Sequence, residues 1–267
     1  IVRRTRSFLE TTIDPATNEP FLKPVLVRLF GEGDAESIIL PAFLERAYHH
    51  AEGFCQALSE REGFNSGFLR TMLLRRVGST IEAGRRTALQ MLGQTLTEDD
   101  VDEDDDTQKV SALYPLLEPE RIHLQAFADT LAESTDEDPK LFEVIRKLDA
   151  GWLELGCIVF SQYFDSAYWL AEKLSGRYPK ERIAIYAGSN KSGIMQAGEF
   201  TPLSREEVKA QVQRAEIRLL LGTDAASEPV NVNGSAASMH VSASMLKPCI
   251  GLGGSADAPL TRIIPAI

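Results

Sequence analysis

The segments GCIVFSQY (156–163), IAIYAGS (183–189) and IRLLLGTD (217–224) decide the fold of this chain. Each is a short apolar run of the length of a buried strand, and each ends in small or hydroxylated residues. Helix-forming stretches separate them, so the order is strand, helix, strand, helix, strand. This alternation predicts an α/β unit with a parallel sheet, whose ligands bind outside the carboxyl ends of the strands.

The composition is that of a globular protein, with 267 residues of which 43% are hydrophobic and 25% charged. The net charge is −11, and the run at 98–106 holds eight of the acidic residues, which is typical of a solvated loop. Cys55, Cys157 and Cys249 form no close pair, which argues against a disulfide framework and fits a cytoplasmic location. No apolar run approaches the ~20 residues that span a bilayer, so we expect no membrane partner.

The part of the chain before the α/β unit is predicted to be mostly helical. Apolar spacing indicates helices over 41–62, 67–77, 79–96, 119–133 and 138–150. Residues 21–30 alternate in the manner of a strand, whereas 229–267 show little periodicity and are expected to form no regular element. Three helix starts carry capping signals, because side-chain oxygens there accept free backbone N–H groups: Ser79 with Glu82, Ser204 with Glu207, and Asp138 with Pro139.

The sequence contains none of the common catalytic motifs that place a reaction. There is no phosphate loop of the form G-x-x-x-x-G-K-[ST], and the cluster GSNKSG (188–193) has similar residues in another order, which favours a flexible loop. There is also no G-x-S-x-G or H-E-x-x-H pattern. His49 and His50 have no metal-ligand spacing to His123, so we assign no metal site and no catalytic residue. These residues alone predict an α/β unit with an unassigned ligand edge.

Four segments, in order, resemble motifs of the bacterial Swi/Snf-like superfamily-two helicases. CIVFSQY (157–163) resembles motif IV, IYAGS (185–189) the strand and loop that follow it, and LLGTDAASE (220–228) motif V. VRRTR (2–6) resembles the element that closes the first motor lobe. The stretch LLRRVGST (73–80) is similar to sequence that recurs in the helices between the lobes, and it also reads as an amphipathic helix with arginines on its wet side.

The resemblance implies a fragment with a RecA-like parallel sheet and flanking helices, an incomplete second lobe, preceded by a mostly helical region. Residues 1–39 correspond to the end of lobe one with its connecting strand and loop, and 40–150 to a helical insertion with an acidic loop at 97–108. Residues 151–228 correspond to part of the C-terminal RecA-like lobe. The chain begins with Ile1, so we expect it to be a piece of a longer protein, and the irregular tail at 229–267 is hypothesised to be frame-shifted or non-native.

The resemblance also implies the site residues and their partners. Nucleic-acid backbone contacts fall on Ser161, Gln162, Gly188, Ser189 and Thr223, and the interlobe ATP cleft on Gly222, Asp224 and Glu228. The implied partners are double-stranded DNA and the missing first motor lobe. ATP and Mg²⁺ belong to the intact parent protein, and neither is expected to bind this fragment tightly. An arginine cluster adds sequence-independent phosphate attraction: Arg70, Arg75, Arg76, Arg85 and Arg86.

The chain departs from the family pattern in two ways. The first lobe is absent, and the sequence after Glu228 contains nothing that resembles the Gly-Arg-x-x-Arg stretch of motif VI. We therefore expect no ATP hydrolysis by this chain alone. One alternative is a non-catalytic α/β interaction domain that binds a partner through its helical region and acidic loop. A nucleotide-binding α/β enzyme is disfavoured, because the phosphate loop is lacking.

Overall fold

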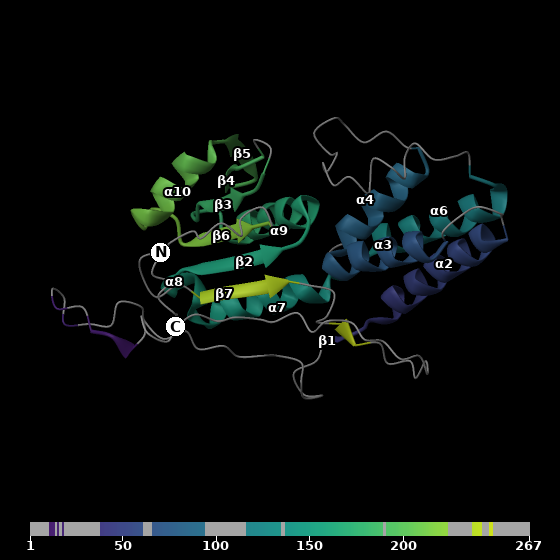
Figure 1. The fold of residues 1–267 in the computed structure, drawn as a ribbon, viewed down its shortest axis with the longest axis horizontal. Helices are drawn as coiled ribbons and strands as arrows, with labels where there is room; N and C mark the ends of the chain where they lie inside the picture. The colour runs from purple at the N-terminus through teal and green to yellow at the C-terminus, as the bar shows by residue number, and fades with distance from the viewer. Residues whose placement is uncertain are drawn as a thin grey trace, which may run out of the picture.

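A computed structural model describes residues 11–13, 15, 18, 38–60, 66–93, 116–134, 137–188, 191–223, 237–241 and 246–247. A helical unit lies beside an α/β unit (Figure 1). The helical unit consists of α2 (Ala42–Ser59), α3 (Ser66–Ser79), α4 (Ile81–Met91) and α6 (Glu118–Glu133). These helices bury one continuous apolar cluster, in which Phe54, Leu73 and Phe127 are at most 1% exposed. The helical periodicity of this region is therefore confirmed, with ends that differ by a few residues.

The α/β unit is built on a six-stranded sheet with strand order β5-β4-β3-β6-β2-β7. Strands β3, β6, β2 and β7 run parallel, while β4 and β5 form an antiparallel hairpin at one edge. The fold is therefore α/β with a mostly parallel sheet, as the sequence predicts. The strands are β2 (Cys157–Ser161), β3 (Ile183–Tyr186), β4 (Gly193–Gln196), β5 (Glu199–Pro202), β6 (Leu219–Gly222) and β7 (Ala237–Val241).

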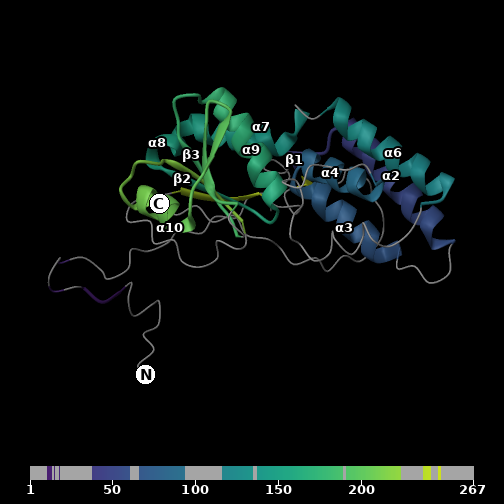
Figure 2. The ribbon, with the colours of Figure 1, turned by 90° about the horizontal axis from the view of Figure 1, so that it is seen from above.

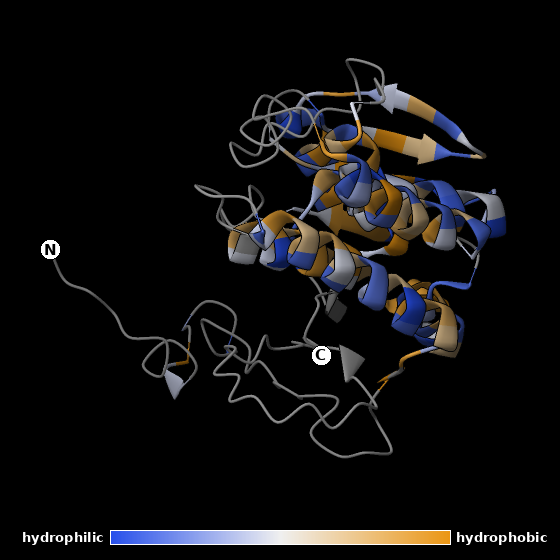
Figure 3. Cartoon of the chain, turned by 90° about the vertical axis from the view of Figure 1, so that its right-hand side faces the viewer, coloured by the Kyte–Doolittle hydropathy of each residue, from blue (hydrophilic) through white to orange (hydrophobic). Residues whose placement is uncertain are grey.

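Helices cover both faces of this sheet (Figure 2). Alternate residues of a strand point to opposite faces, so Cys157 and Val159 pack toward α9 (Phe164–Arg177), whereas Ile158 and Phe160 pack toward α10 (Arg205–Gln213). Hydrophobic and hydrophilic residues alternate along the helices that face the viewer in Figure 3. The sheet thus forms the middle of three layers.

Helix α7 (Pro139–Lys147) packs its apolar side chains against the sheet. Its Leu141 and Val144 belong to the same apolar cluster as α9 and β2. A π-helical turn, η4 (Leu148–Trp152), follows it and contains Gly151 at φ 104°, before the short helix α8 (Leu153–Leu155) leads into β2. The helix expected over 138–150 is therefore present, and it belongs with the α/β unit.

Several sequence expectations differ from the structure. The hairpin β4–β5 lies where only a loop and a helix were expected. β7 lies inside the tail that was expected to be irregular, and Leu246–Lys247 (β8) pairs with Ile38–Ile39 (β1). The strand expected over 21–30 lies outside the described residues. Helix α4 begins one residue later than the capping pattern indicates, because Thr80 and not Ser79 accepts the N–H of Ala83, at 3.2 Å.

Helices α3 and α4 approach each other closely at Gly84. A Cβ atom added to Gly84 would lie 2.7 Å from Cβ and 2.9 Å from Cα of Val77, a separation that side-chain rotation cannot relieve. We predict that Gly84→Ala lowers the free energy of unfolding by about 1–3 kcal/mol, since overpacking outweighs the higher helix propensity of alanine. Chemical denaturation monitored by circular dichroism measures the change.

Gly176 provides the matched control in α9. No atom lies within 4 Å of a Cβ added there, so Gly176→Ala is expected to be neutral or to stabilise the protein by up to about 1 kcal/mol. Equal effects of the two substitutions would contradict the close approach of Val77 to Gly84.

Candidate nucleic-acid interface

The carboxyl ends of three neighbouring parallel strands meet at one edge of the sheet. Phe160 of β2 and Tyr186 of β3 both pair with Gly222 of β6, so the three strands end in register. The backbone N–H of Thr223 donates to the carbonyl of Tyr186 at 3.1 Å. In a parallel sheet this edge is where ligands bind.

Most of the predicted site residues that the structure describes lie along this edge. Gln162 is the first residue after β2, Gly188 is the second residue after β3, and Thr223 is the first residue after β6. Gln162 is exposed, Gly188 half-buried, and Thr223 6% exposed. Gly222 is buried at the end of β6. The remaining predicted residues lie outside the described part of the chain: Ser189, Asp224 and Glu228.

Ser161 also ends β2, but its hydroxyl points away from solvent. It is 3% exposed, and its Oγ lies 3.3 Å from Oγ of Ser79 in the helical unit. A ligand at the edge therefore meets the exposed amide of Gln162 rather than the hydroxyl of Ser161. The sequence gives no sign of this contact, because Ser79 is far away along the chain.

Two basic side chains lie at the same edge, and sequence reasoning passed over both. Nζ of Lys191 is 5.0 Å from the ring centroid of Phe164, at the start of α9, and Cζ of Arg205 is 4.8 Å from that of Tyr186, at the end of β3. Such cation–π contacts restrict long side chains and hold their charge in place. Lys191 belongs to the segment interpreted as a flexible loop, and Arg205 is the first residue of the capped helix α10.

The loop that carries Lys191 is fixed by a buried serine. The hydroxyl of Ser192 accepts from the N–H of Ala187 at 3.0 Å and donates to the carbonyl of Ala187 at 2.9 Å. The N–H of Lys191 donates to the carbonyl of Gly188 at 3.0 Å. Because Ser192 is fully buried, the two ends of this short loop are held together at the end of β3.

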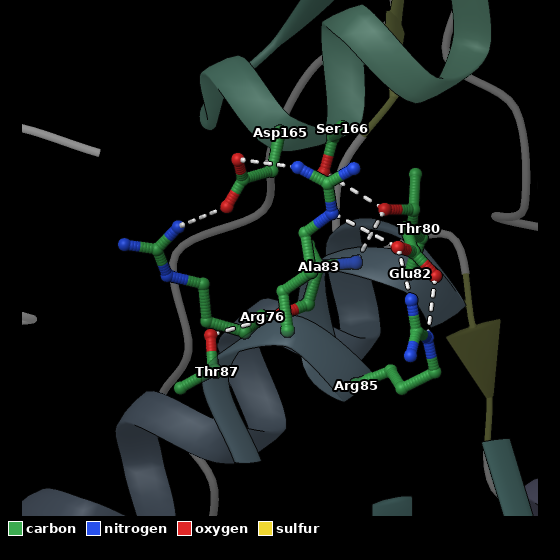
Figure 4. A network of polar contacts seen from close by, with 9 residues as sticks. Arg76, Thr80, Glu82, Ala83, Arg85, Thr87, Asp165 and Ser166 are labelled. Carbon is green, nitrogen blue, oxygen red and sulfur yellow. Dashed lines mark hydrogen bonds and ion pairs between the residues drawn. The ribbon is translucent and has the colours of Figure 1, made fainter. Parts of the chain in front are cut away.

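Residues 76–82, the α3–α4 joint, contact the turn between β2 and α9 through buried charges (Figure 4). Cζ of Arg76 lies 3.9 Å from the ring centroid of Tyr163, and its Nη1 lies 3.8 Å from the carboxylate of Asp165. Arg86 approaches the same carboxylate at 3.6 Å. Arg76 and Asp165 are each 3% exposed, so both charges are removed from water and depend on these partners.

Hydroxyl groups form a second set of contacts at the α3–α4 joint. Oγ of Ser166 lies 2.8 Å from Oγ of Ser79 and 2.9 Å from Oγ1 of Thr80. All of these side chains are at most 3% exposed. The first turn of α9 is thus hydrogen-bonded to the start of α4.

Helix α7 contacts the α3–α4 joint from another side. The carboxylate of Asp138 accepts the N–H of Ile81 at 2.9 Å and caps α7 through the N–H of Lys140 at 2.8 Å, which confirms the predicted cap. The ammonium group of Lys140 donates to the carbonyl of Gly78. Burial lowers the pKa of Lys140 to about 7, although the nearby Asp138 carboxylate opposes this change.

The arginine cluster that was expected to attract phosphate is largely engaged with carboxylates. Arg85 donates two hydrogen bonds of 2.7 Å to Glu82, and Arg86 donates one of 2.9 Å. Burial raises the pKa of Glu82, but the hydrogen bonds from both arginines outweigh it and lower that pKa overall. Arg70 pairs with a carboxylate of α2 at 3.0 Å, while Arg75 is exposed. Arg70, Arg76, Arg85 and Arg86 thus pair with carboxylates of this chain, and Lys191 and Arg205 are further cations at the strand ends that the sequence did not indicate.

No family model matches this chain, and no curated protein matches its sequence. Within the described ranges, no helix is long and apolar enough to cross a membrane. The same part of the chain contains no group of three or more His, Cys, Asp or Glu side chains that could hold a metal ion.

The lowered pKa of Lys140 predicts a pH dependence of stability. In the unfolded chain this lysine keeps its usual pKa of 10.5, whereas in the folded protein it loses its proton near pH 7. Unfolding between these values takes up a proton, so stability rises with pH in this window. We predict that the wild type gains about 2 kcal/mol of unfolding free energy between pH 7 and pH 9 relative to Lys140→Met.

Urea denaturation of both proteins at the two pH values measures this difference. Burial raises the pKa values of Tyr48, Cys55 and Cys157 to about 12, 11 and 12, and their contribution to the pH dependence cancels because both proteins contain them. Parallel pH profiles of the wild type and Lys140→Met would show that Lys140 keeps its proton in the folded protein.

Proposed function

We propose that this chain is part of the C-terminal motor lobe of a Swi/Snf-like superfamily-two DNA translocase, with the helical region that precedes it. The observation that carries the proposal is the edge where β2, β3 and β6 end in register, after which come Gln162, Gly188 and Thr223. Each of these three residues lies within one of the segments that resemble the helicase motifs. A RecA-like lobe places its ligand contacts at such strand ends, and the α/β architecture is compatible with one.

The chemistry at this edge suits a phosphate backbone. An exposed amide at Gln162 and the cations Lys191 and Arg205 offer hydrogen-bond donors and positive charge at this edge. Contacts of this kind fix a nucleic acid in position without reading its sequence. The proposed partner is therefore duplex DNA, bound through its backbone.

ATP and Mg²⁺ enter only through the intact parent protein. The chain contains no phosphate loop, and its described residues provide no cluster of ligands for a metal ion. These residues alone do not fit a nucleotide site, so we assign them no step of hydrolysis. In the proposed function, the missing first lobe supplies the phosphate loop and the carboxylates that hold Mg²⁺.

The first test is salt-dependent binding to a short DNA duplex, measured by fluorescence anisotropy. We predict that the logarithm of the association constant falls linearly with the logarithm of the salt concentration. Lys191→Gln and Arg205→Gln should each weaken binding equally for duplexes of different sequence and reduce the slope by about 1. The physical reason is the loss of one phosphate contact in each variant.

Lys180→Gln is the matched control, because Lys180 is exposed and precedes β3, at the opposite edge of the sheet. It removes the same charge and should leave the slope nearly unchanged. Equal losses in all three variants would indicate only a general effect of net charge. Absence of binding by the wild type at low salt would favour the non-catalytic interaction domain.

The second test concerns ATP. We predict that the purified chain releases no phosphate from ATP, with or without duplex DNA, in a coupled phosphate-release assay. DNA-stimulated release that survives repurification and is lost in Thr223→Ala would overturn the proposal that hydrolysis needs the missing lobe.

A further inference from the structure

The turn between β2 and α9 is the part of the candidate interface that the helical unit holds most closely. Of residues 161–166, Ser161, Tyr163, Asp165 and Ser166 all contact the α3–α4 joint. Phe164 faces Lys191 instead. Gln162 is the exposed residue of this turn. The exposed Gln162 is thus flanked on both sides by residues that contact the helical unit.

The charges at the α3–α4 joint favour a single arrangement of the two units. Arg76 lies between the Tyr163 ring and the Asp165 carboxylate, at 3.9 and 3.8 Å. Sliding the helical unit along the sheet would leave the buried Asp165 without its cations, and an uncompensated buried charge is strongly destabilising. Buried ion pairs of this kind act best as devices that set register.

Three helices begin at the α3–α4 joint, and each brings a carboxylate to its first turn or cap. These carboxylates are Glu82 in α4, Asp138 at α7 and Asp165 in α9. A helix N-terminus carries a partial positive charge that favours a carboxylate there, although burial outweighs this at Asp138 and raises its pKa. Without these carboxylates, the positive ends of the three helices would repel each other. With the carboxylates present, the three helix starts form one polar cluster.

We propose that the α3–α4 joint positions Gln162, and that Arg76 and Ser79 are the residues through which the helical unit holds the nucleic-acid edge of the sheet. Neither residue contacts the ligand. Each acts through the β2–α9 turn, Arg76 on Tyr163 and Asp165, and Ser79 on Ser161 and Ser166. The part of this inference that concerns DNA rests on the proposed function, whereas the mechanical part does not.

Hydrogen–deuterium exchange on the full chain tests the mechanical part. Ser79→Ala removes two hydroxyl contacts and should raise the exchange rate of a peptide covering 162–167 about five-fold, the factor expected for one lost hydrogen bond. Arg76→Gln should raise it further. Arg85→Gln is the control, since Arg85 contacts Glu82 on its own helix, and it should leave this peptide unchanged.

The outcomes of the exchange experiment separate positioning from general stability. Faster exchange confined to 162–167, with β3 and β6 unchanged, supports the proposal. Unchanged exchange in Ser79→Ala, or an equal rise in Arg85→Gln, overturns it. If Arg76→Gln unfolds and therefore exchanges faster in every peptide, the result for Ser79→Ala alone tests the positioning role.

A double-mutant cycle tests the link to DNA. Ser79→Ala should weaken duplex binding about five-fold in the wild-type background, but should have no further effect when Gln162→Ala is already present. A merely structural role predicts equal effects in both backgrounds, and that result would overturn the positioning role. If the wild type binds no duplex, the proposed function fails, while the exchange experiment still decides the mechanical part.

Discussion

The buried guanidinium of Arg76 is the constraint on which the arrangement of the two units depends. At 3% exposure it has lost its hydration, and the Tyr163 ring and the Asp165 carboxylate replace it. Tyr163 and Asp165 both lie just after β2, so they reach the guanidinium only when the helical unit lies against this part of the chain. The apolar clusters of the two units are separate, and the polar α3–α4 joint between them determines how they meet.

Local signals explain which parts of the fold could be predicted from the sequence. Each short apolar run forms a strand because its length and bounding residues leave little choice, and Asp138 and Ser204 cap helices because the groups they bond lie within three residues. The hairpin β4–β5 was missed because its strands have four residues each and its turn is Ala197-Gly198, both at positive φ. An Asn-Gly pair predicts such a turn, whereas alanine at the first position is not a turn signal.

The displaced cap of α4 shows where local reasoning stops. Ser79 and Thr80 are both good N-cap residues, and the sequence alone does not rank them. Thr80 takes the cap, and the hydroxyl of Ser79 contacts Ser161 and Ser166 instead. The arginines were misjudged for the same reason, since spacing places Arg76 on a helix face but does not reveal that Asp165 covers it. Tertiary partners far along the chain decided both positions.

The candidate interface and the α3–α4 joint share the first turn of α9, and this has a mechanical consequence. Phe164 faces Lys191 at the strand ends, while the next residue, Asp165, faces Arg76 in the helical unit. In the proposed function, a backbone phosphate that drew Lys191 away from its ring would change the environment of Phe164, which adjoins Asp165. Because the buried charges of the joint tolerate little displacement, a movement of the first turn of α9 would be coupled to the helical unit. In the proposed translocase, DNA binding and the orientation of the helical unit are therefore linked through neighbouring residues of one helix start.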